Sequence, residues 1–177
     1  MSGSQYNFVK KMFGDRWGSD PIVGIEIGTA TGELTKAMLE GCPRLVLHSI
    51  DPWRHKEWAD FEAGRDQPYH DCNLRQASDK LQGYMRAGRC HLYAIGSMEA
   101  KFKVPHEVDF VWIDGDHSDE GITQDLDTFE SVVKPGVIFG GHDFGLVEGL
   151  TAIIRQRYGG PLLHLGDDFT WWIDVPA

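Results

Sequence analysis

The chain has 177 residues, of which 41% are hydrophobic and 25% charged, with a formal net charge of −10. This acidic balance excludes sequence-independent nucleic-acid binding, which depends on lysine and arginine. The three cysteines show neither metal-site nor disulfide spacing, and no apolar run reaches signal-peptide or membrane-span type. We therefore expect residues 1–177 to form a single domain, reduced and cytoplasmic, with no membrane partner.

Apolar runs and amphipathic segments alternate along the sequence. Residues 5–17 carry an apolar stripe at helical spacing. Strands are expected at residues 21–27, 44–50, 90–95, 107–113 and 137–141, and helices at 32–40, from 71 to 85, at 97–102, from 119 to 133 and from 146 to 158. Residues 161–166 and 168–175 indicate a terminal hairpin-like pair.

This alternation predicts an α/β fold. We expect a single Rossmann-like, doubly wound, mostly parallel sheet with helices on both faces and a C-terminal antiparallel strand pair. Ligands of such sheets bind at the carboxyl ends of the strands. Residues 52–70 have no clean period and connect the second strand to a helix at that edge, so we expect them to form a substrate loop.

A glycine turn follows the first strand in the sequence "GIEIGTATGELT", residues 24–35. Gly28 and Gly32 allow a close approach to a ligand, whereas Glu26 lies within the strand and needs a partner there. Asp51 ends the next strand, where an acid binds the ribose hydroxyls of nucleotides. The spacing differs from the G-x-G-x-x-G of dinucleotide-binding proteins and fits a ligand with a ribose but no pyrophosphate.

A cluster of acids and histidines follows two later strands. In "DFVWIDGDHSDEG", residues 109–121, the strand ends directly in Asp114, Asp116 and His117. Stability alone does not require such a cluster at the end of a strand, although Asp116 and His117 could instead cap the next helix, for which Ser118 is a good N-cap. His142 and Asp143 end the fifth predicted strand.

Four segments together resemble the class I S-adenosylmethionine-dependent methyltransferases: "EIGTATG", "SIDPW", "FVWIDGDHSDEGITQDLDTF" and "VKPGVIFGGHDF". The sequence is most similar to a small-molecule O-methyltransferase-like subfamily with an "IDGDHSYEG"-type motif. That subfamily is related to macrolide and aminocoumarin sugar methyltransferases and to cephalosporin-hydroxylase-like proteins. The resemblance runs from about Val23 to Trp172 and implies methyl transfer from S-adenosylmethionine to an oxygen of a small-molecule acceptor.

The resemblance also implies roles for individual residues. The implied cofactor-binding residues are Glu26, Gly28, Thr29, Gly32, Asp51, Pro52, Trp53, Gly96, Ser97 and Asp114. In metal-dependent relatives, acids at these strand ends hold a divalent ion, which here implies Asp114, His142 and Asp143 as ligands of Mg²⁺ or Mn²⁺. His142 stands where the sugar methyltransferases carry an acid, and imidazole suits Mn²⁺ better than Mg²⁺. Without a metal, His117 or His142 is the candidate base and Asp143 the group that orients it.

Three other interpretations stay open at this point. A nicotinamide oxidoreductase could share the sheet, although the glycine spacing weighs against it. A non-catalytic module could bind S-adenosylmethionine or a nucleotide without turnover. A metal-dependent hydrolase or hydroxylase-like enzyme could use the acids and histidines alone. The identity of the acceptor and the oligomeric state, a homodimer included, do not follow from the sequence.

Overall fold

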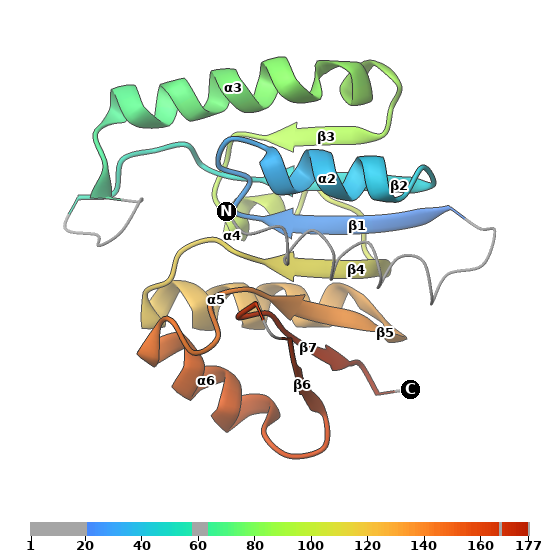
Figure 1. The fold of residues 1–177 in the computed structure, drawn as a ribbon, viewed down its shortest axis with the longest axis vertical. Coiled ribbons are helices and arrows are strands. Elements are labelled where there is room, and N and C mark those ends of the chain that lie inside the picture. The colour runs from blue at the N-terminus through green and yellow to red at the C-terminus, as the bar shows by residue number, and fades with distance from the viewer. Residues whose placement is uncertain (1–20, 58–63, 167, 177) are drawn as a thin grey trace.

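The computed structural model describes residues 21–57, 64–166 and 168–176 (Figure 1). The helix expected at residues 5–17 lies outside this part of the chain. The strands are β1 (Ile22–Ile27), β2 (Leu45–Ile50), β3 (Cys90–Tyr93), β4 (Val108–Ile113), β5 (Val133–Gly141), β6 (Leu163–Leu165) and β7 (Trp171–Asp174). The helices are α2 (Glu33–Gly41), α3 (Gln67–Arg86), α4 (Ser97–Ala100), α5 (Asp119–Phe129) and α6 (Glu148–Tyr158), with a 3₁₀ turn, η2, at Glu130–Val132.

The strands form one sheet in the order β3-β2-β1-β4-β5-β7-β6. Strands β1 to β5 pair in parallel, and β7 pairs antiparallel with both β5 and β6. The labelled strands β1, β3 and β4 point their arrowheads to the same side in Figure 1. The predicted fold is therefore confirmed, and the strand order reverses between β1 and β4, which is where sheets of this type open a ligand crevice.

Strand β4 shows why the central strands read as continuous apolar runs. Its successive side chains point to opposite faces of the sheet, and both faces are covered by helices. Phe110 and Trp112 pack in a cluster with residues of α2 and α3. Val111 and Ile113 pack in a second cluster with residues of α5 and α6. The helices thus cover both faces, and the sheet edge with its loops is left for function.

Helix α3 begins at Gln67, four residues before the start that the sequence suggested. The Asp66 side chain accepts the N–H of Tyr69 at 3.2 Å, and Pro68 occupies the first turn, which together make a strong helix start. The last four residues of the expected substrate loop 52–70 are therefore helical. Residues 58–63 of that loop lie outside the described part of the chain.

The "KPG" segment, residues 134–136, does not precede β5 as expected but lies inside it. Gly136 takes a φ of 79°, and the pairing between β4 and β5 shifts register between Val108 and Phe110. The irregular backbone absorbs Pro135, which cannot donate to a regular ladder. Over the described ranges, none of the helices combines the length and the hydropathy that a membrane span requires.

Candidate active site

The turn after β1 lies directly against the end of β4. Gly28 has a φ of 91°, and a Cβ added there would lie 1.8 Å from the carbonyl oxygen of Asp114. The Gly28 N–H donates to Ile50 at 2.9 Å, and the Asp114 N–H donates to Ile27 at 2.8 Å. Any side chain at position 28 would push these strand ends apart, so glycine is required for their close approach.

Asp51 holds the glycine turn and the start of the next loop together. Its Oδ2 atom accepts the N–H of Ala30 and its Oδ1 atom accepts the N–H of Trp53, each at 2.8 Å. The indole N–H of Trp53 donates to the Ala30 carbonyl at 2.8 Å, and Trp53 is 3% exposed, whereas Pro52 is exposed. The structure therefore places these three predicted cofactor residues beside the turn and gives Asp51 a structural role as well.

Two buried polar side chains, one at the end of β1 and one on the turn after it, each carry an atom with no hydrogen-bond partner among the described residues. Glu26 is fully buried, and its Oε2 atom accepts the hydroxyl of Thr35 at 2.6 Å, but its Oε1 atom is unpaired. The hydroxyl of Thr29 is also buried and unpaired. Buried polar atoms are normally satisfied, so these two atoms are candidate contacts for a ligand. Burial raises the pKa of Glu26 to about 7, against the hydrogen bond of Thr35, which lowers it.

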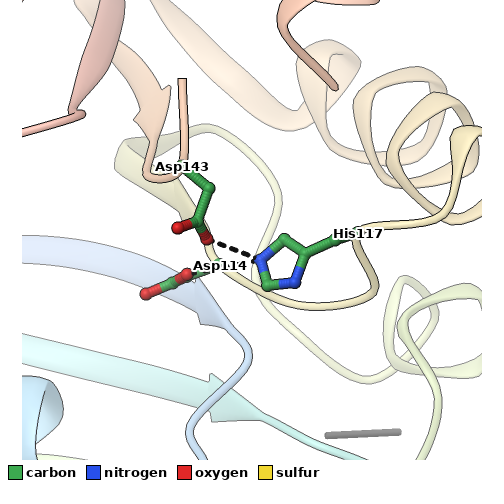
Figure 2. Close-up of side chains that lie close together, drawn as sticks. All are labelled: Asp114, His117 and Asp143. Carbon is green, nitrogen blue, oxygen red and sulfur yellow. Dashed lines mark ion pairs between the residues drawn. The ribbon is translucent and has the colours of Figure 1, made fainter. Parts of the chain in front are cut away.

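An acid–histidine cluster lies beyond the carboxyl ends of β4 and β5. It consists of Asp114, His117, His142 and Asp143. Figure 2 shows the His117 ring facing the Asp143 carboxylate, with Asp114 beside them. The Nε2 atom of His117 lies 2.7 Å from Asp143 Oδ2 and 3.7 Å from Asp114 Oδ1. The Nδ1 atom of His142 lies 3.1 Å from Asp143 Oδ1 and 4.0 Å from Asp114 Oδ1.

The charges of the cluster stabilise one another. Hydrogen bonds with Asp114 and Asp143 raise the pKa of His117 to about 10. Burial opposes ionisation of Asp143, but hydrogen bonds from the two histidines hold its pKa below the usual range. Burial instead raises the pKa of Asp114. The cluster thus pairs an imidazolium with carboxylates at neutral pH, an arrangement that is typical of functional sites.

The turn after β5 has a backbone conformation that few residue types adopt. Asp143 has a φ of 64°, in the left-handed region that favours glycine and tolerates Asp and Asn. The Nε2 atom of His142 lies 2.9 Å from the carbonyl oxygen of Asp168, which orients the ring. The loop between β6 and β7 therefore supports the cluster, a contact between distant residues that sequence spacing does not reveal.

Asp116 lies beside the cluster but serves a different purpose. Its carboxylate accepts the N–H of Ser118 at 3.0 Å and pairs with Lys56 at 2.6 Å. Ser118 caps α5 by accepting the N–H of Gly121 at 3.1 Å. The capping interpretation of this stretch is confirmed for Ser118, and Asp116 braces the same turn, while His117 points to the acids.

Gly96 and Ser97 lie at the end of β3, where Gly96 precedes the short helix α4. The Ser97 hydroxyl hydrogen-bonds the carboxylate of Asp125, which is 3% exposed and whose pKa is raised to about 7 by burial. Asp125 is not among the site residues that the sequence predicts. A sequence reader could have noticed it because Asp125 is an acid on the apolar face of α5, next to Leu126, where the other residues are mostly uncharged and buried.

One group of three side chains could hold a divalent ion within the part of the chain that the structure describes. Donor atoms of Asp114, His117 and Asp143 lie within 4.8 Å of one another. The resemblance instead implied Asp114, His142 and Asp143. The two sets of candidate metal ligands share both acids, but among the described residues only the set with His117 has all of its donor atoms within this distance of one another. A mixed imidazole and carboxylate set fits Mn²⁺ better than Mg²⁺.

Comparison with known proteins shows the family of this chain. A family model described as "Methyltransferase domain" matches residues 25–144, which include the glycine turn and the whole acid–histidine cluster. No curated protein matches the sequence significantly.

Three solved structures illustrate the shared fold. An O-methyltransferase from Bacillus cereus, in complex with S-adenosylhomocysteine, is 13% identical with a TM-score of 0.66 and covers 99% of this chain and 82% of its own. A second structure is the O-methyltransferase TomG from Streptomyces achromogenes, which is involved in tomaymycin synthesis and was solved with S-adenosylmethionine. It is 12% identical with a TM-score of 0.63, and the match covers 98% of this chain and 78% of TomG. An rRNA methylase from Streptococcus thermophilus is 9% identical with a TM-score of 0.62, and the match covers 96% of this chain and 93% of the methylase. At these identities the likeness establishes the fold and does not identify an acceptor.

Proposed function

The chain belongs to the Methyltransferase domain family, and from this we propose that it transfers the methyl group of S-adenosylmethionine to an oxygen of a small-molecule acceptor. The observation that carries the proposal is the contact between Gly28 and Asp114, which joins the glycine turn to the acid–histidine cluster at one sheet edge. A cofactor on the turn would then lie next to groups that can accept a proton.

The residues of the turn fit the proposed cofactor. Glu26 and Thr29 each offer a buried polar atom that no described residue satisfies, which suits the amino-acid end of the cofactor. The carboxylate of Asp51 lies at the end of β2 beside the turn, the position at which an acid binds the ribose hydroxyls of a nucleotide. When bound, S-adenosylmethionine supplies a methyl group on a positively charged sulfur.

The acid–histidine cluster would prepare the acceptor. In the transfer, the hydroxyl oxygen of the acceptor forms a bond to the methyl carbon, the carbon–sulfur bond breaks, and its electron pair goes to sulfur. The hydroxyl proton must leave to a group of the protein, and the gain from placing such a group is about 10²- to 10⁴-fold. Asp143 lies within hydrogen-bonding distance of His117 and His142, so a proton that reaches one member of the cluster can be shared with the others.

Two routes for the proton follow from the cluster. In the first, a divalent cation held by Asp114, His117 and Asp143 would orient the hydroxyl and lower its pKa. In the second, a histidine is the base and Asp143 orients it. The raised pKa of His117, about 10, bears on both routes, because a protonated ring must lose its proton before it can accept another or bind a cation.

The acidity of the chain supports a small-molecule acceptor over RNA, although an rRNA methylase shares the fold. The formal charge of −10 repels a phosphate backbone, and binding to RNA requires basic surface.

Calorimetry and turnover test the proposal together. The wild-type chain should bind S-adenosylhomocysteine and should form it from S-adenosylmethionine when a hydroxyl acceptor is present. Under the metal route, chelation with EDTA abolishes transfer and Mn²⁺ restores it. Full activity after chelation, lost in His117→Ala or His142→Ala, would establish the histidine route. Binding without turnover across hydroxyl acceptors would favour a non-catalytic module, and the absence of binding would refute the proposal.

A further inference from the structure

A groove separates helix α5 from the segment that begins with α4. Its volume is about 710 Å³. Met98, Lys101 and Phe102 line the groove from the α4 side, and residues of α5 that include Asp119 and Glu120 line the opposite wall. None of these residues belongs to the glycine turn or to the acid–histidine cluster. The groove is therefore a separate feature of the surface.

Two apolar side chains of the α4 segment point away from the core. Ala100 and Val104 are buried and pack in one cluster with residues of α5 and α6. The N–H of Val104 donates to the Ala100 carbonyl at 3.0 Å, so the segment is helical, and residues two positions apart lie on opposite sides of a helix. Met98 is accordingly 52% exposed, with its sulfur 3.1 Å from the Thr128 hydroxyl of α5, and Phe102 is 84% exposed. Neighbouring apolar side chains left in water along a groove are typical of an interaction site.

The two walls of the groove carry opposite charges. Lys101 lies on the α4 wall next to Phe102, whereas Asp119 and Glu120 lie on the α5 wall. Within the described part of the chain, none of these three charged residues is in an ion pair with another residue. Two further cations beside the groove are paired within the protomer, Lys103 with Glu99 and Arg157 with Asp127. The groove thus presents a positive wall and a negative wall with apolar side chains between them.

This charge pattern decides which kind of partner fits the groove. A uniformly basic partner would be repelled by Lys101, and a uniformly acidic one, such as a nucleic acid, by Asp119 and Glu120. A second copy of the same surface, rotated by 180°, brings each wall against the wall of opposite charge. The surface is therefore complementary to itself.

We propose that the groove is the contact face of a homodimer, in which the Phe102 ring of each copy enters the groove of the other. Lys101 of each copy then faces Glu120 of the partner subunit, and the two-fold axis passes between the two Phe102 rings. The apolar contact of Phe102 and Met98 supplies affinity, and the charge pairs fix the orientation. This inference does not depend on the proposed methyl transfer.

Sedimentation of the full chain tests the apolar contact. The wild type should show an equilibrium between monomer and dimer that depends on protein concentration. Phe102→Ser should weaken the association by at least about tenfold. Because the Phe102 ring is 84% exposed, this variant should melt no lower than the wild-type monomer. The matched control is Leu165→Ser, since Leu165 is a 52% exposed apolar residue on β6, outside the groove, and this variant should associate as the wild type does.

A charge swap tests whether the occupant is a second copy. Lys101→Glu places like charges opposite each other at both ends of the interface, and Glu120→Lys does the same with the opposite sign. Each variant alone should associate at least about tenfold more weakly than the wild type. An equimolar mixture of the two should associate as tightly as the wild type, because every contact then joins opposite charges. That recovery would also show that both variants are folded.

Overall charge is controlled separately, because each chain carries a formal net charge of −10 and copies repel one another at long range. Glu120→Lys reduces this repulsion, so weaker association of this variant cannot come from net charge. Asp79→Lys makes the same charge change on α3, where Asp79 is exposed, and should associate no more weakly than the wild type.

Three results would overturn the inference. A wild type that stays monomeric up to about 1 mM protein would show that no dimer of useful affinity exists. A dimer of unchanged affinity in Phe102→Ser would place the contact elsewhere on the protein. A mixture of Lys101→Glu and Glu120→Lys that associates no more tightly than either variant alone would refute the two-fold pairing of the walls.

Discussion

The two halves of the sheet edge are stabilised in different ways. At the β1–β2 half, the charged group Asp51 is satisfied by backbone N–H groups of Ala30 and Trp53. At the β4–β5 half, His117 and Asp143 satisfy each other's charges. The first half is arranged by the chain itself and offers unpaired atoms to a ligand. The stability of the second half depends on the protonation state of its side chains. Binding or loss of a proton, a cation or an acceptor can therefore change the interactions within it.

Replacing Asp143 should give the largest difference between the two halves, with a strong effect on methyl transfer and little effect on cofactor binding. Asp143→Asn keeps a residue that tolerates the positive φ but removes the charge that pairs with both histidines. Methyl transfer should fall by about 10²- to 10⁴-fold, the range expected for loss of proton transfer. Affinity for S-adenosylhomocysteine, measured by calorimetry, should change by less than about twofold, or 0.4 kcal/mol.

The control for this variant is Asp79→Asn, which alters an exposed acid on α3. Transfer at the wild-type rate by Asp143→Asn would show that the β4–β5 half is not where the acceptor reacts.

Replacing Asp51 should have the opposite effect. A carboxylate that binds two ribose hydroxyls contributes on the order of 2–3 kcal/mol. Asp51→Ala should therefore weaken S-adenosylhomocysteine binding by roughly 30- to 150-fold. Because Asp51 also holds two backbone N–H groups, circular dichroism must show that the variant is folded, with Asp79→Ala as the matched control. Unchanged affinity in a folded variant would remove the ribose assignment.

Alkaline pH should weaken the β4–β5 half through His117. The pKa of His117 is about 10 in the folded protein and about 6.5 when unfolded, so the folded state binds the proton more tightly. This stabilisation is complete below pH 6.5 and is lost as pH rises through 10. Glu26 and Asp125 titrate near pH 7, but burial raises the pKa of Cys90 to about 12, so between pH 8 and 10 the contribution of His117 is the difference between the wild type and a His117 variant.

Urea unfolding over that range should show a loss of roughly 2 kcal/mol in the wild type. His117→Gln should flatten the slope, whereas His106→Gln, at an exposed position, should keep it. A wild-type slope in His117→Gln would contradict the charge pairing in the cluster.

The smallest effect is expected at Thr29. Its hydroxyl has no partner among the described residues, so Thr29→Val should not lower the free energy of unfolding. It should weaken S-adenosylhomocysteine binding by roughly 3- to 10-fold, the value of one hydrogen bond. Thr35→Val makes the reverse test, because it removes the hydrogen bond to Glu26 and should destabilise the fold by about 1–2 kcal/mol. If Thr29→Val destabilises as much as Thr35→Val, Thr29 is structural.

The sequence was sufficient to predict the fold and to predict that residues of separate strand ends lie close together. Central strands such as β4 are buried on both faces and therefore stand out as apolar runs, and strand ends in a parallel sheet must share an edge. The start of α3 was missed although Asp66 and Pro68 signal it locally, because the charged residues around them suggested a loop.

Long-range contacts at the site were beyond the sequence. The preference for His117 over His142 as a third donor depends on the positive φ of Asp143 and on the loop that holds His142. Likewise, Asp125 gains meaning only from its contact with Ser97, which lies on another element. Periodicity reports which face a side chain takes and contains no information about which distant group it meets there.

The central claim is that the cofactor occupies the β1–β2 half with its sulfur directed to the β4–β5 half. A crystal grown with S-adenosylhomocysteine and Mn²⁺ tests it most directly. The account predicts ribose hydroxyls within hydrogen-bonding distance of Asp51, the amino-acid end at Glu26 and Thr29, and the sulfur facing the acid–histidine cluster. Density for S-adenosylhomocysteine elsewhere on the protein, with the glycine turn vacant, would contradict the account.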